Sequence, residues 1–255
     1  MRLATWNINS LKLRLPRVLE WLSSQQPDVL ALQETKVQDA HFPALELKAA
    51  GYHAIYAGQR SYNGVALLSR IPASDTVTAL PGLDDQQMRV LTATAQGVRV
   101  ISFYVPNGQS VGSDKYGYKL EWLAAATEFL RSEYIQHPLL AVVGDFNIAP
   151  EDRDVHDPDV WRGRIMCSDA ERAAFRAWLE LGLKDAFRLF EQPEKTFSWW
   201  DYRQLAFPKN LGLRIDHILL SPELARVCTA CRIDRQARKG QKPSDHAPVM
   251  AELSL

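Results

Sequence analysis

The sequence predicts an α/β protein in which two mainly antiparallel β-sheets pack together with helices on the outside. Strand-like runs outnumber helical segments and often follow one another directly, which argues against one parallel sheet with regularly alternating strands and helices. The chain has 255 residues, of which 46% are hydrophobic, and this is enough for one large α/β core. We therefore expect residues 1–255 to form a single domain.

The N-terminal part begins with a strand, a helix and a second strand. Residues 3–6 and 29–32 are short apolar runs that predict the two strands. Between them, apolar side chains recur at helical spacing over residues 13–22, and Pro16 stands early enough to occupy the first turn of that helix.

The rest of the chain contains three further predicted helices and seven predicted strands. The helices are expected at residues 42–50, 118–136 and 168–181. The last helix has a capping box formed by Ser168 and Glu171, and Gly182 is expected to end it. Gln96 and Gly97 lie between two strands and are typical of a hairpin turn. The strands are expected at residues 54–57, 64–69, 89–94, 98–105, 139–143, 214–220 and 248–253.

Composition excludes some classes of function. The chain has 30 basic and 30 acidic residues, so net charge does not indicate a nucleic-acid partner. A basic stretch at residues 226–242 either meets phosphates near the loop of His246 or is a solvated surface loop. No apolar run approaches the roughly 18 residues of a membrane span, and the N-terminus does not resemble a signal peptide. We therefore expect a cytoplasmic protein without a membrane partner.

The three cysteines are an odd number, which argues against a disulfide framework. Cys228 and Cys231 form a CxxC pair, but the sequence has no second such pair and no histidine at a zinc-finger spacing. Structural thiols are therefore favoured over a zinc or redox site.

Two polar residues that follow strand-like runs are candidate metal ligands. Asn7 and Glu34 offer an amide oxygen and a carboxylate, which suit Mg²⁺, an ion that keeps several waters for a phosphate substrate. Taken singly, a turn residue and a surface acid are the commoner explanations of these two positions.

Asp145 and Asn147 follow another apolar run and are two residues apart. In a locally extended chain, both side chains point into the same space. Asp145 could then activate a water while Asn147 holds that water or a phosphate oxygen. An Asx turn that closes the strand is the alternative.

Asp216 lies inside an apolar run, where a carboxylate needs a partner. Pairing with His246 would raise the pKa of that imidazole and hold a cation against a phosphate. A structural ion pair of Asp216 with Arg214 or His217 is the alternative. Asp245, next to His246, is a further candidate metal ligand or simply holds its loop.

Together these motifs resemble the exonuclease III group of AP endonucleases, within the endonuclease/exonuclease/phosphatase superfamily. The resemblance implies a four-layered α/β sandwich and the hydrolysis of DNA phosphodiesters with Mg²⁺ or Mn²⁺. The matching stretches occur in family order over essentially the whole chain: residues 5–10 (TWNINS), 32–36 (LQETK), 62–66 (YNGVA), 104–108 (YVPNG), 144–150 (GDFNIAP), 196–203 (TFSWWDYR), 213–217 (LRIDH) and 244–248 (SDHAP).

The resemblance also implies how the metal and the attacking water are held. Glu34 corresponds to the metal carboxylate, supported by Asn7 and Asp245. Asp145 corresponds to the residue that orients or deprotonates the water.

Further residues are implied as contacts of the phosphate and the transition state. These are Asn147, Tyr104 and His246, with Asp216 orienting His246. A cation and neutral donors at these positions would stabilise the charge that develops on the phosphate oxygens. Asn107 is expected as a further substrate contact.

The resemblance places Trp199, Trp200 and Leu213 around a pocket for a base-less sugar or a frayed 3′ nucleotide. From the residues alone, the aromatic cluster at residues 197–202 is as readily explained by packing in the core. Arg203 is expected as another substrate contact. Residues 155–167 look individual to this chain.

We therefore expect an enzyme, a DNA-repair nuclease that acts as a monomer on double-stranded DNA. It would cut 5′ to abasic sites, remove nucleotides and blocking groups from 3′ ends, or do both, and leave a 3′-hydroxyl. The alternatives are a phosphodiesterase for inositol phosphates or sphingomyelin, a secreted DNase I-like nuclease, and an inactive binding module. An inactive module would lack at least one of four residues, and the chain has them all: Glu34, Asp145, Asn147 and His246.

Overall fold

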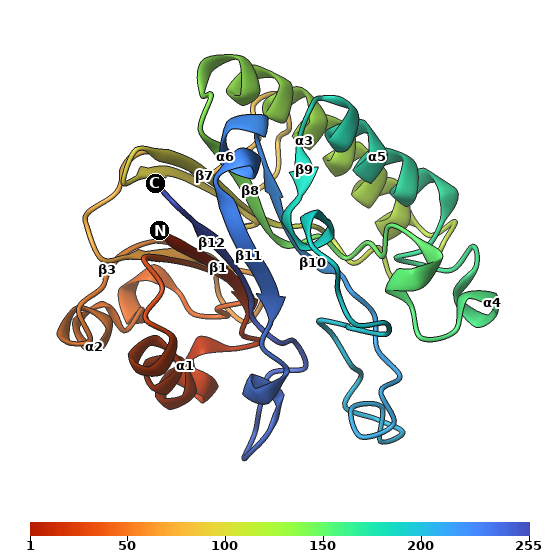
Figure 1. Cartoon of the computed structure of the whole chain (residues 1–255), viewed down its shortest axis with the longest axis horizontal. Coiled ribbons are helices and arrows are strands. Elements are labelled where there is room, and N and C mark those ends of the chain that lie inside the picture. Colours follow the sequence, from red (N-terminus) through yellow and green to blue (C-terminus); the bar gives the residue numbers. More distant parts are fainter.

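Two six-stranded β-sheets pack face to face in this protein, whose computed structural model describes residues 1–255 (Figure 1). The first sheet contains β1 (Arg2–Asn7), β2 (Val29–Gln33), β3 (His53–Ala57), β4 (Val65–Ser69), β11 (Cys228–Ile233) and β12 (Val249–Leu253). The second contains β5 (Ser74–Val77), β6 (Val90–Ala95), β7 (Val98–Tyr104), β8 (Leu140–Asp145), β9 (Lys184–Asp185) and β10 (Asp216–Leu220). The strand orders are β11-β12-β1-β2-β4-β3 and β5-β6-β7-β8-β10-β9.

Helices cover the outer face of each sheet, so the molecule has four layers (Figure 1). The α-helices are α1 (Leu11–Gln25), α2 (Ala44–Ala49), α3 (Asp114–Gln136), α4 (Pro158–Trp161), α5 (Asp169–Glu180) and α6 (Pro222–Arg226). Helices α1 and α2 lie on the first sheet, and α3 and α5 lie on the second. None of the helices has a stretch that is both long and apolar enough to cross a membrane. The predicted four-layered sandwich is confirmed.

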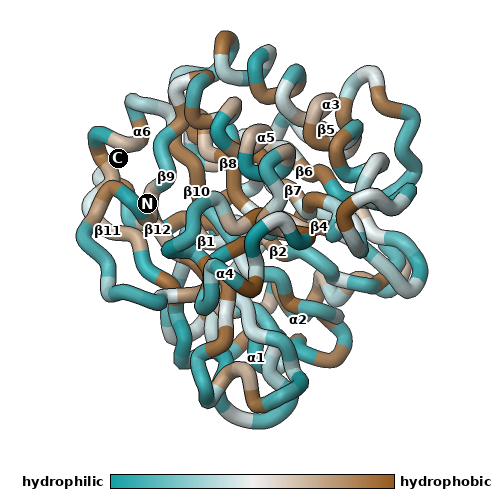
Figure 2. Tube along the Cα trace, turned by 90° about the vertical axis from the view of Figure 1, so that its right-hand side faces the viewer, coloured by the Kyte–Doolittle hydropathy of each residue, from teal (hydrophilic) through white to brown (hydrophobic).

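The central strands are apolar on both faces because both faces are covered. In β8, Ala141 and Val143 belong to the core between the two sheets, whereas Leu140 and Val142 pack under α3 and α5. Successive residues of a strand point to opposite faces, so an unbroken apolar run is buried on both sides. Figure 2 shows the hydrophobic character of β8 and β10 near the middle of the molecule.

Each sheet has one parallel pair of strands near its centre. These pairs are β1 with β2 and β7 with β8, and every other neighbouring pair is antiparallel. A parallel pair needs a crossover connection, which α1 supplies in the first sheet and α3 in the second. The prediction of two mainly antiparallel sheets is therefore correct.

Three strands that the sequence did not indicate, β5, β9 and β11, all lie at edges of the sheets. Three of the four residues of β5 are exposed, so this strand lacks the apolar pattern of a buried strand. Strand β11 carries Cys228 and Cys231, and all three cysteines of the chain are free thiols. Burial raises the pKa of the Cys231 thiol, which makes it unreactive.

Several local signals in the sequence are confirmed. Ser168 and Glu171 form the predicted capping box at the start of α5. Gln96 and Gly97 join β6 to β7 as a two-residue turn in which both have positive φ, 51° and 82°. Helix α3 begins four residues earlier than predicted, because Ser113 caps it by accepting a hydrogen bond from a backbone N–H of its first turn.

Gly144, the residue before Asp145, allows β7 and β8 to approach closely. Its φ is +142°, and a Cβ at this position would lie 1.9 Å from the backbone oxygen of Phe103. We expect Gly144→Ala to lower the free energy of unfolding by about 2 kcal/mol or more, because the two strands must separate. Urea denaturation measures this change.

Gly117→Ala is the matched control for that measurement. Gly117 lies within α3, and an added Cβ meets no atom within 4 Å. This substitution is expected to raise stability by about 0.5–1 kcal/mol, because alanine favours a helix interior over glycine. Equal stability of Gly144→Ala and the unmodified protein would show that the sheet accommodates a side chain there.

Candidate active site

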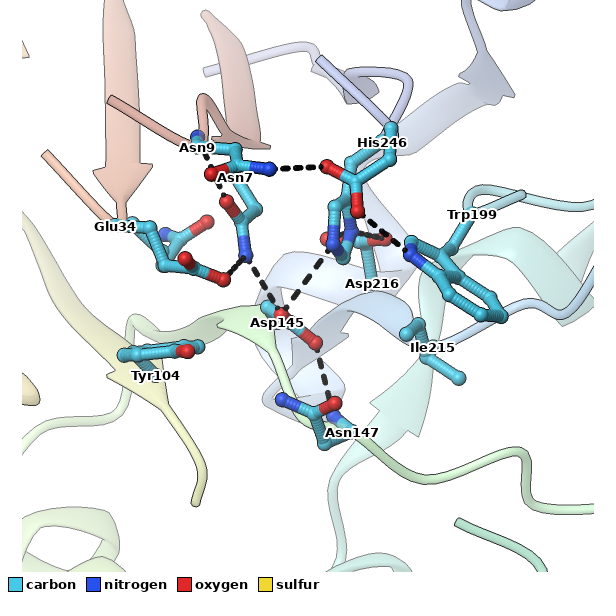
Figure 3. A network of polar contacts seen from close by, with 12 residues as sticks. Asn7, Asn9, Glu34, Tyr104, Asp145, Asn147, Trp199, Ile215, Asp216 and His246 are labelled. Atoms are coloured by element: carbon cyan, nitrogen blue, oxygen red, sulfur yellow. Dashed lines mark hydrogen bonds and ion pairs between the residues drawn. The ribbon is translucent and has the colours of Figure 1, made fainter. Parts of the chain in front are cut away.

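Polar side chains from both sheets converge where the central strands end (Figure 3). Asn7 ends β1, Glu34 follows β2, and Asp145 ends β8. Asp216 begins β10 and is paired in register with Asp145. The apolar strands thus bring four polar groups to one edge of the packed sheets.

Asp145 lies at the centre of this group and is 1% exposed. Its Oδ2 accepts a hydrogen bond from Asn7 Nδ2 at 2.8 Å, and its Oδ1 accepts one from the backbone N–H of Asn147 at 3.0 Å. Burial raises the pKa of Asp145 to about 7, although the nearby positive charge of His246 opposes the shift. A carboxylate with a pKa near neutrality is suited to take a proton from water.

His246 and Asp216 form a buried pair beside Asp145. The imidazole Nδ1 of His246 lies 2.9 Å from Asp216 Oδ2, and its Nε2 lies 3.7 Å from Asp145 Oδ2. Burial opposes a charge on the imidazole, but the carboxylates of Asp216 and Asp145 outweigh it and raise the pKa of His246 to about 10. At neutral pH, His246 is therefore a fixed cation with two N–H donors.

The alternative ion pairs of Asp216 do not form. Arg214 is instead bound by Asp154, at 2.6 Å, and by Asp185, at 2.8 Å. Burial, followed by the charge of Arg214, lowers the pKa of His217 to about 4, so this imidazole is neutral.

Glu34 and Asp145 are the groups best placed to hold a divalent metal. Ligand atoms of Glu34, Asp145 and His246 all lie within 4.8 Å of one another. His246 is held by Asp216 through Nδ1, so Glu34 and Asp145 are the carboxylate members of this group. Two carboxylates close together on the edge of a buried site fit a hard cation such as Mg²⁺.

Asn7 contacts this metal-binding group as a hydrogen-bond donor. Its Nδ2 donates to Glu34 Oε1 at 2.8 Å and to Asp145, while its Oδ1 accepts from the backbone N–H of Asn9 at 3.0 Å. In this arrangement Asn7 fixes the two carboxylates, and its oxygen is directed away from them. The structure thus brings Asn7 to the predicted place in a different orientation.

Asp245 lies beside the cluster of Asn7, Glu34, Asp145, Asp216 and His246, which we name the catalytic group. Both carboxylate oxygens of Asp245 are hydrogen-bonded. Oδ1 accepts from Asn9 Nδ2 at 2.9 Å and Oδ2 accepts from Trp199 Nε1 at 3.0 Å. Although burial opposes ionisation, the charge of His246 and these donors hold the pKa of Asp245 below its usual value. Asp245 therefore connects the Asn9 loop to Trp199, and it is not one of the closely grouped metal-ligand candidates.

Tyr104, Asn107 and Asn147 form the donor side of the site. Burial, together with the charges of Glu34 and Asp145, raises the pKa of Tyr104 well above its usual value, so its hydroxyl keeps its proton. Asn107 Nδ2 donates to Asn147 Oδ1 at 3.1 Å. Asn147 Nδ2 donates to the backbone oxygen of Val105 at 3.0 Å, so contacts within the protein fix the two amides, and the Tyr104 hydroxyl is the neutral donor beside the carboxylates.

The predicted pocket residues are only partly brought together. Trp199 borders the site, with its ring centroid 6.5 Å from that of His246. Leu213 pairs with Trp199 through the backbone and is fully buried beneath it. Trp200 is not part of the site: its side chain is 0% exposed, lies in a separate core cluster and donates from Nε1 to Asn210. Neighbours in an extended segment point to opposite sides, which explains the difference between the two tryptophans.

Arg203 and the basic stretch at residues 226–242 are the other predicted basic contacts. The side chain of Arg203 is 84% exposed and is paired with Asp201 at 2.8 Å. In the basic stretch at residues 226–242, Arg238 is buried and donates to the backbone oxygen of Ser244. Arg232 pairs with Glu252. Arg238 is the one buried basic residue of this stretch, and Arg226, Arg232, Arg235, Lys239 and Lys242 are exposed.

Further polar residues, which the sequence did not indicate, support the site. Lys36 Nζ lies 2.8 Å from Glu34 Oε2 and donates to Asn9 Oδ1 at 2.6 Å. Lys119 is fully buried, pairs with Glu171 and donates to the backbone oxygen of Asn147 at 2.8 Å. Lys36 and Asn9 stand two residues after Glu34 and Asn7, a spacing that could have indicated them. Lys119 lies on α3, where nothing in the sequence distinguishes it from a surface lysine.

Comparison with known proteins agrees with this geometry. Residues 4–246 match the endonuclease/exonuclease/phosphatase family. The chain is 36% identical to exodeoxyribonuclease III of Haemophilus influenzae and 32% identical to an exodeoxyribonuclease of Bacillus subtilis, over at least 99% of this chain and 100% of each relative.

Solved structures agree over the whole chain as well. The 3′-5′ exonuclease NExo of Neisseria meningitidis superposes with a TM-score of 0.98 at 47% identity, and an AP endonuclease of Archaeoglobus fulgidus with a TM-score of 0.95 at 36% identity. Each comparison covers 100% of both chains. The chain therefore belongs to the endonuclease/exonuclease/phosphatase family, as a hydrolytic DNA-repair nuclease of the exonuclease III type.

Proposed function

We propose that this nuclease hydrolyses phosphoesters at the 3′ ends of double-stranded DNA and leaves a 3′-hydroxyl. The observation that carries the proposal is the central carboxylate of Asp145, which lies between the amide of Asn7 and the protonated His246. A Neisseria 3′ phosphatase bound to a product DNA hairpin is 46% identical to this chain, with a TM-score of 0.98, which supports a DNA 3′ end as the substrate.

The residues of the site have complementary roles in this reaction. Asp145 takes a proton from the attacking water, and the backbone N–H of Asn147 keeps the carboxylate oriented. His246 and Tyr104 would stabilise the negative charge that develops on the phosphate oxygens. In-line attack on phosphorus needs mainly such positioning and charge stabilisation.

A divalent cation completes the site in this proposal, with Mg²⁺ as the expected ion and Mn²⁺ as a substitute. Glu34 would hold it together with an oxygen of Asp145. When bound, the ion neutralises charge on the phosphate and polarises its oxygens.

Glu34→Ala is expected to raise the Mg²⁺ concentration for half-maximal cleavage at least about tenfold, because one of two carboxylate ligands is lost. A Mg²⁺ titration of hairpin cleavage measures the change. Glu20→Ala, which removes an exposed acid from α1, is the control and should leave the titration unchanged. Identical titrations for Glu34→Ala and the unmodified enzyme would remove Glu34 from the metal site.

Incision 5′ to an abasic site is the second candidate activity. It is favoured by the AP endonuclease of Archaeoglobus fulgidus at 36% identity. The half-buried Trp199 beside His246 also offers an apolar wall for a base-less sugar.

Three labelled DNA hairpins in Mg²⁺, each repeated with EDTA, test both activities. One carries a 3′-terminal phosphate, one a recessed 3′-hydroxyl end, and one an internal abasic analogue. We expect metal-dependent removal of the phosphate and of terminal nucleotides. A nick at the abasic analogue alone would make incision the main activity, and no cleavage of any hairpin would contradict a DNA substrate.

A further inference from the structure

A cavity of about 300 Å³ lies next to the catalytic group and shares one wall with it. That wall is Trp199, whose indole N–H edge is turned toward Asp245 (Figure 3). The other walls of the cavity include Trp161, His156 and Leu211, and none of its lining residues belongs to the catalytic group. Trp161 and His156 come from residues 155–167, the segment between β8 and α5.

The walls of this cavity have the chemistry of a nucleobase site. Two indoles, those of Trp161 and Trp199, supply aromatic surfaces on which a base can stack. The indole N–H of Trp161 is buried and has no hydrogen-bond partner. His156 donates from Nδ1 to the backbone oxygen of Gly212, at 3.2 Å, which leaves its Nε2 as an acceptor. A heterocycle with a hydrogen-bond donor on its edge would satisfy this nitrogen of His156.

The charge around the cavity favours a neutral ligand over a phosphate. Arg203 lines it and carries the nearest positive charge among its lining residues, but this guanidinium is paired with the carboxylate of Asp201 at 2.8 Å. Both members of the pair line the cavity, so their charges cancel there. A base, which is neutral and planar, fits this environment better than an anion does.

We propose that the cavity binds the unpaired nucleobase of the 3′-terminal nucleotide while that nucleotide is being removed. The inference rests on the proposed function and adds that the sugar of the departing nucleotide lies against Trp199, which is beside His246. The base is attached directly to that sugar. The cavity is bordered by Trp199 and has aromatic walls, so it can receive the base. A terminal phosphate and an abasic sugar carry no base, so the cavity acts only in nucleotide removal.

The chemical step in this mode is an ordinary hydrolysis. The oxygen of water bonds to phosphorus as its proton passes to Asp145, and the bond between phosphorus and O3′ of the preceding nucleotide breaks. The bonding electron pair stays with O3′, which takes up a proton. The products are a 5′-mononucleotide and a DNA end with a 3′-hydroxyl.

Two hairpins that differ only in the last nucleotide test this proposal. One ends in a normal nucleotide, and the other ends in a tetrahydrofuran analogue that lacks the base, so both present the same scissile phosphodiester. The quantity measured is the ratio of kcat/KM for the two hairpins. We expect Trp161→Ala to lower this ratio about tenfold, because it removes one stacking surface for the base. Trp161→Phe should retain most of the ratio, since an aromatic face remains.

The comparison of variants separates a base site from a structural role. Val160→Ala, a change at an exposed position of the same short helix, is the control and should leave the ratio unchanged. A Trp161→Ala enzyme that loses activity equally on both hairpins, or keeps the original ratio, would overturn the proposal. Failure of the unmodified protein to cut either hairpin in Mg²⁺ would instead contradict the proposed function.

Discussion

Asp145→Asn is expected to lower kcat for 3′-end cleavage by about 10³–10⁴-fold while the affinity for DNA changes little. Asparagine has nearly the same shape and can still accept the hydrogen bond from the backbone N–H of Asn147. It cannot take a proton from water, so the chemical step is lost. Single-turnover cleavage of a labelled hairpin measures the rate, and fluorescence anisotropy measures the affinity.

The same substitution is not expected to destabilise the fold. Burial raises the pKa of Asp145, so the folded protein disfavours its ionised form, and a neutral side chain removes that cost. Asp84→Asn is the control, since Asp84 is exposed and distant in sequence from the catalytic motifs. A kcat within threefold of the unmodified enzyme would show that Asp145 is not the base.

Asp216→Asn is expected to lower kcat by about 10³-fold, with a small effect on KM. Asp216 holds the imidazole of His246 at 2.9 Å and stabilises its positive charge. Without that carboxylate, burial favours the neutral imidazole, and the phosphate loses a cation where charge develops in the transition state. Steady-state kinetics on the 3′-phosphate hairpin give kcat and KM separately.

A double-mutant cycle shows whether Asp216 acts through His246. His246→Gln alone is expected to remove the cation, so adding Asp216→Asn should cost little more. Asp216→Glu should recover part of the activity, because it restores a carboxylate. Independent, multiplicative losses in the double variant would mean that Asp216 has a role apart from positioning His246.

The architecture was largely predictable because its signals are local. The buried strands are apolar at almost every position, since they are covered on both faces. The hairpin at Gln96-Gly97 and the capping box at Ser168 depend on only a few neighbouring residues. The edge strands β5 and β9 were missed because an exposed or very short strand has no such pattern.

The orientation of individual site residues was less predictable. Asn7 was expected to offer its oxygen to a metal, but its Nδ2 donates to two carboxylates instead. Trp200 was expected at the pocket, yet it packs in the core while Trp199 borders the site. A one-residue difference in an extended segment moves a side chain to the opposite side, and the sequence does not state which side faces the substrate.

The sequence by itself determined which reactive groups the protein has and that Asn7, Glu34 and Asp145 follow buried strand-like runs. This is possible because strand periodicity and polar breaks in it are properties of short segments. Only the tertiary structure decided which groups touch, since Asn7 and Asp145 are 138 residues apart and meet through the packing of two sheets. It also decided the charges, because burial and proximity together raise the pKa of His246 to about 10 and that of Asp145 to about 7.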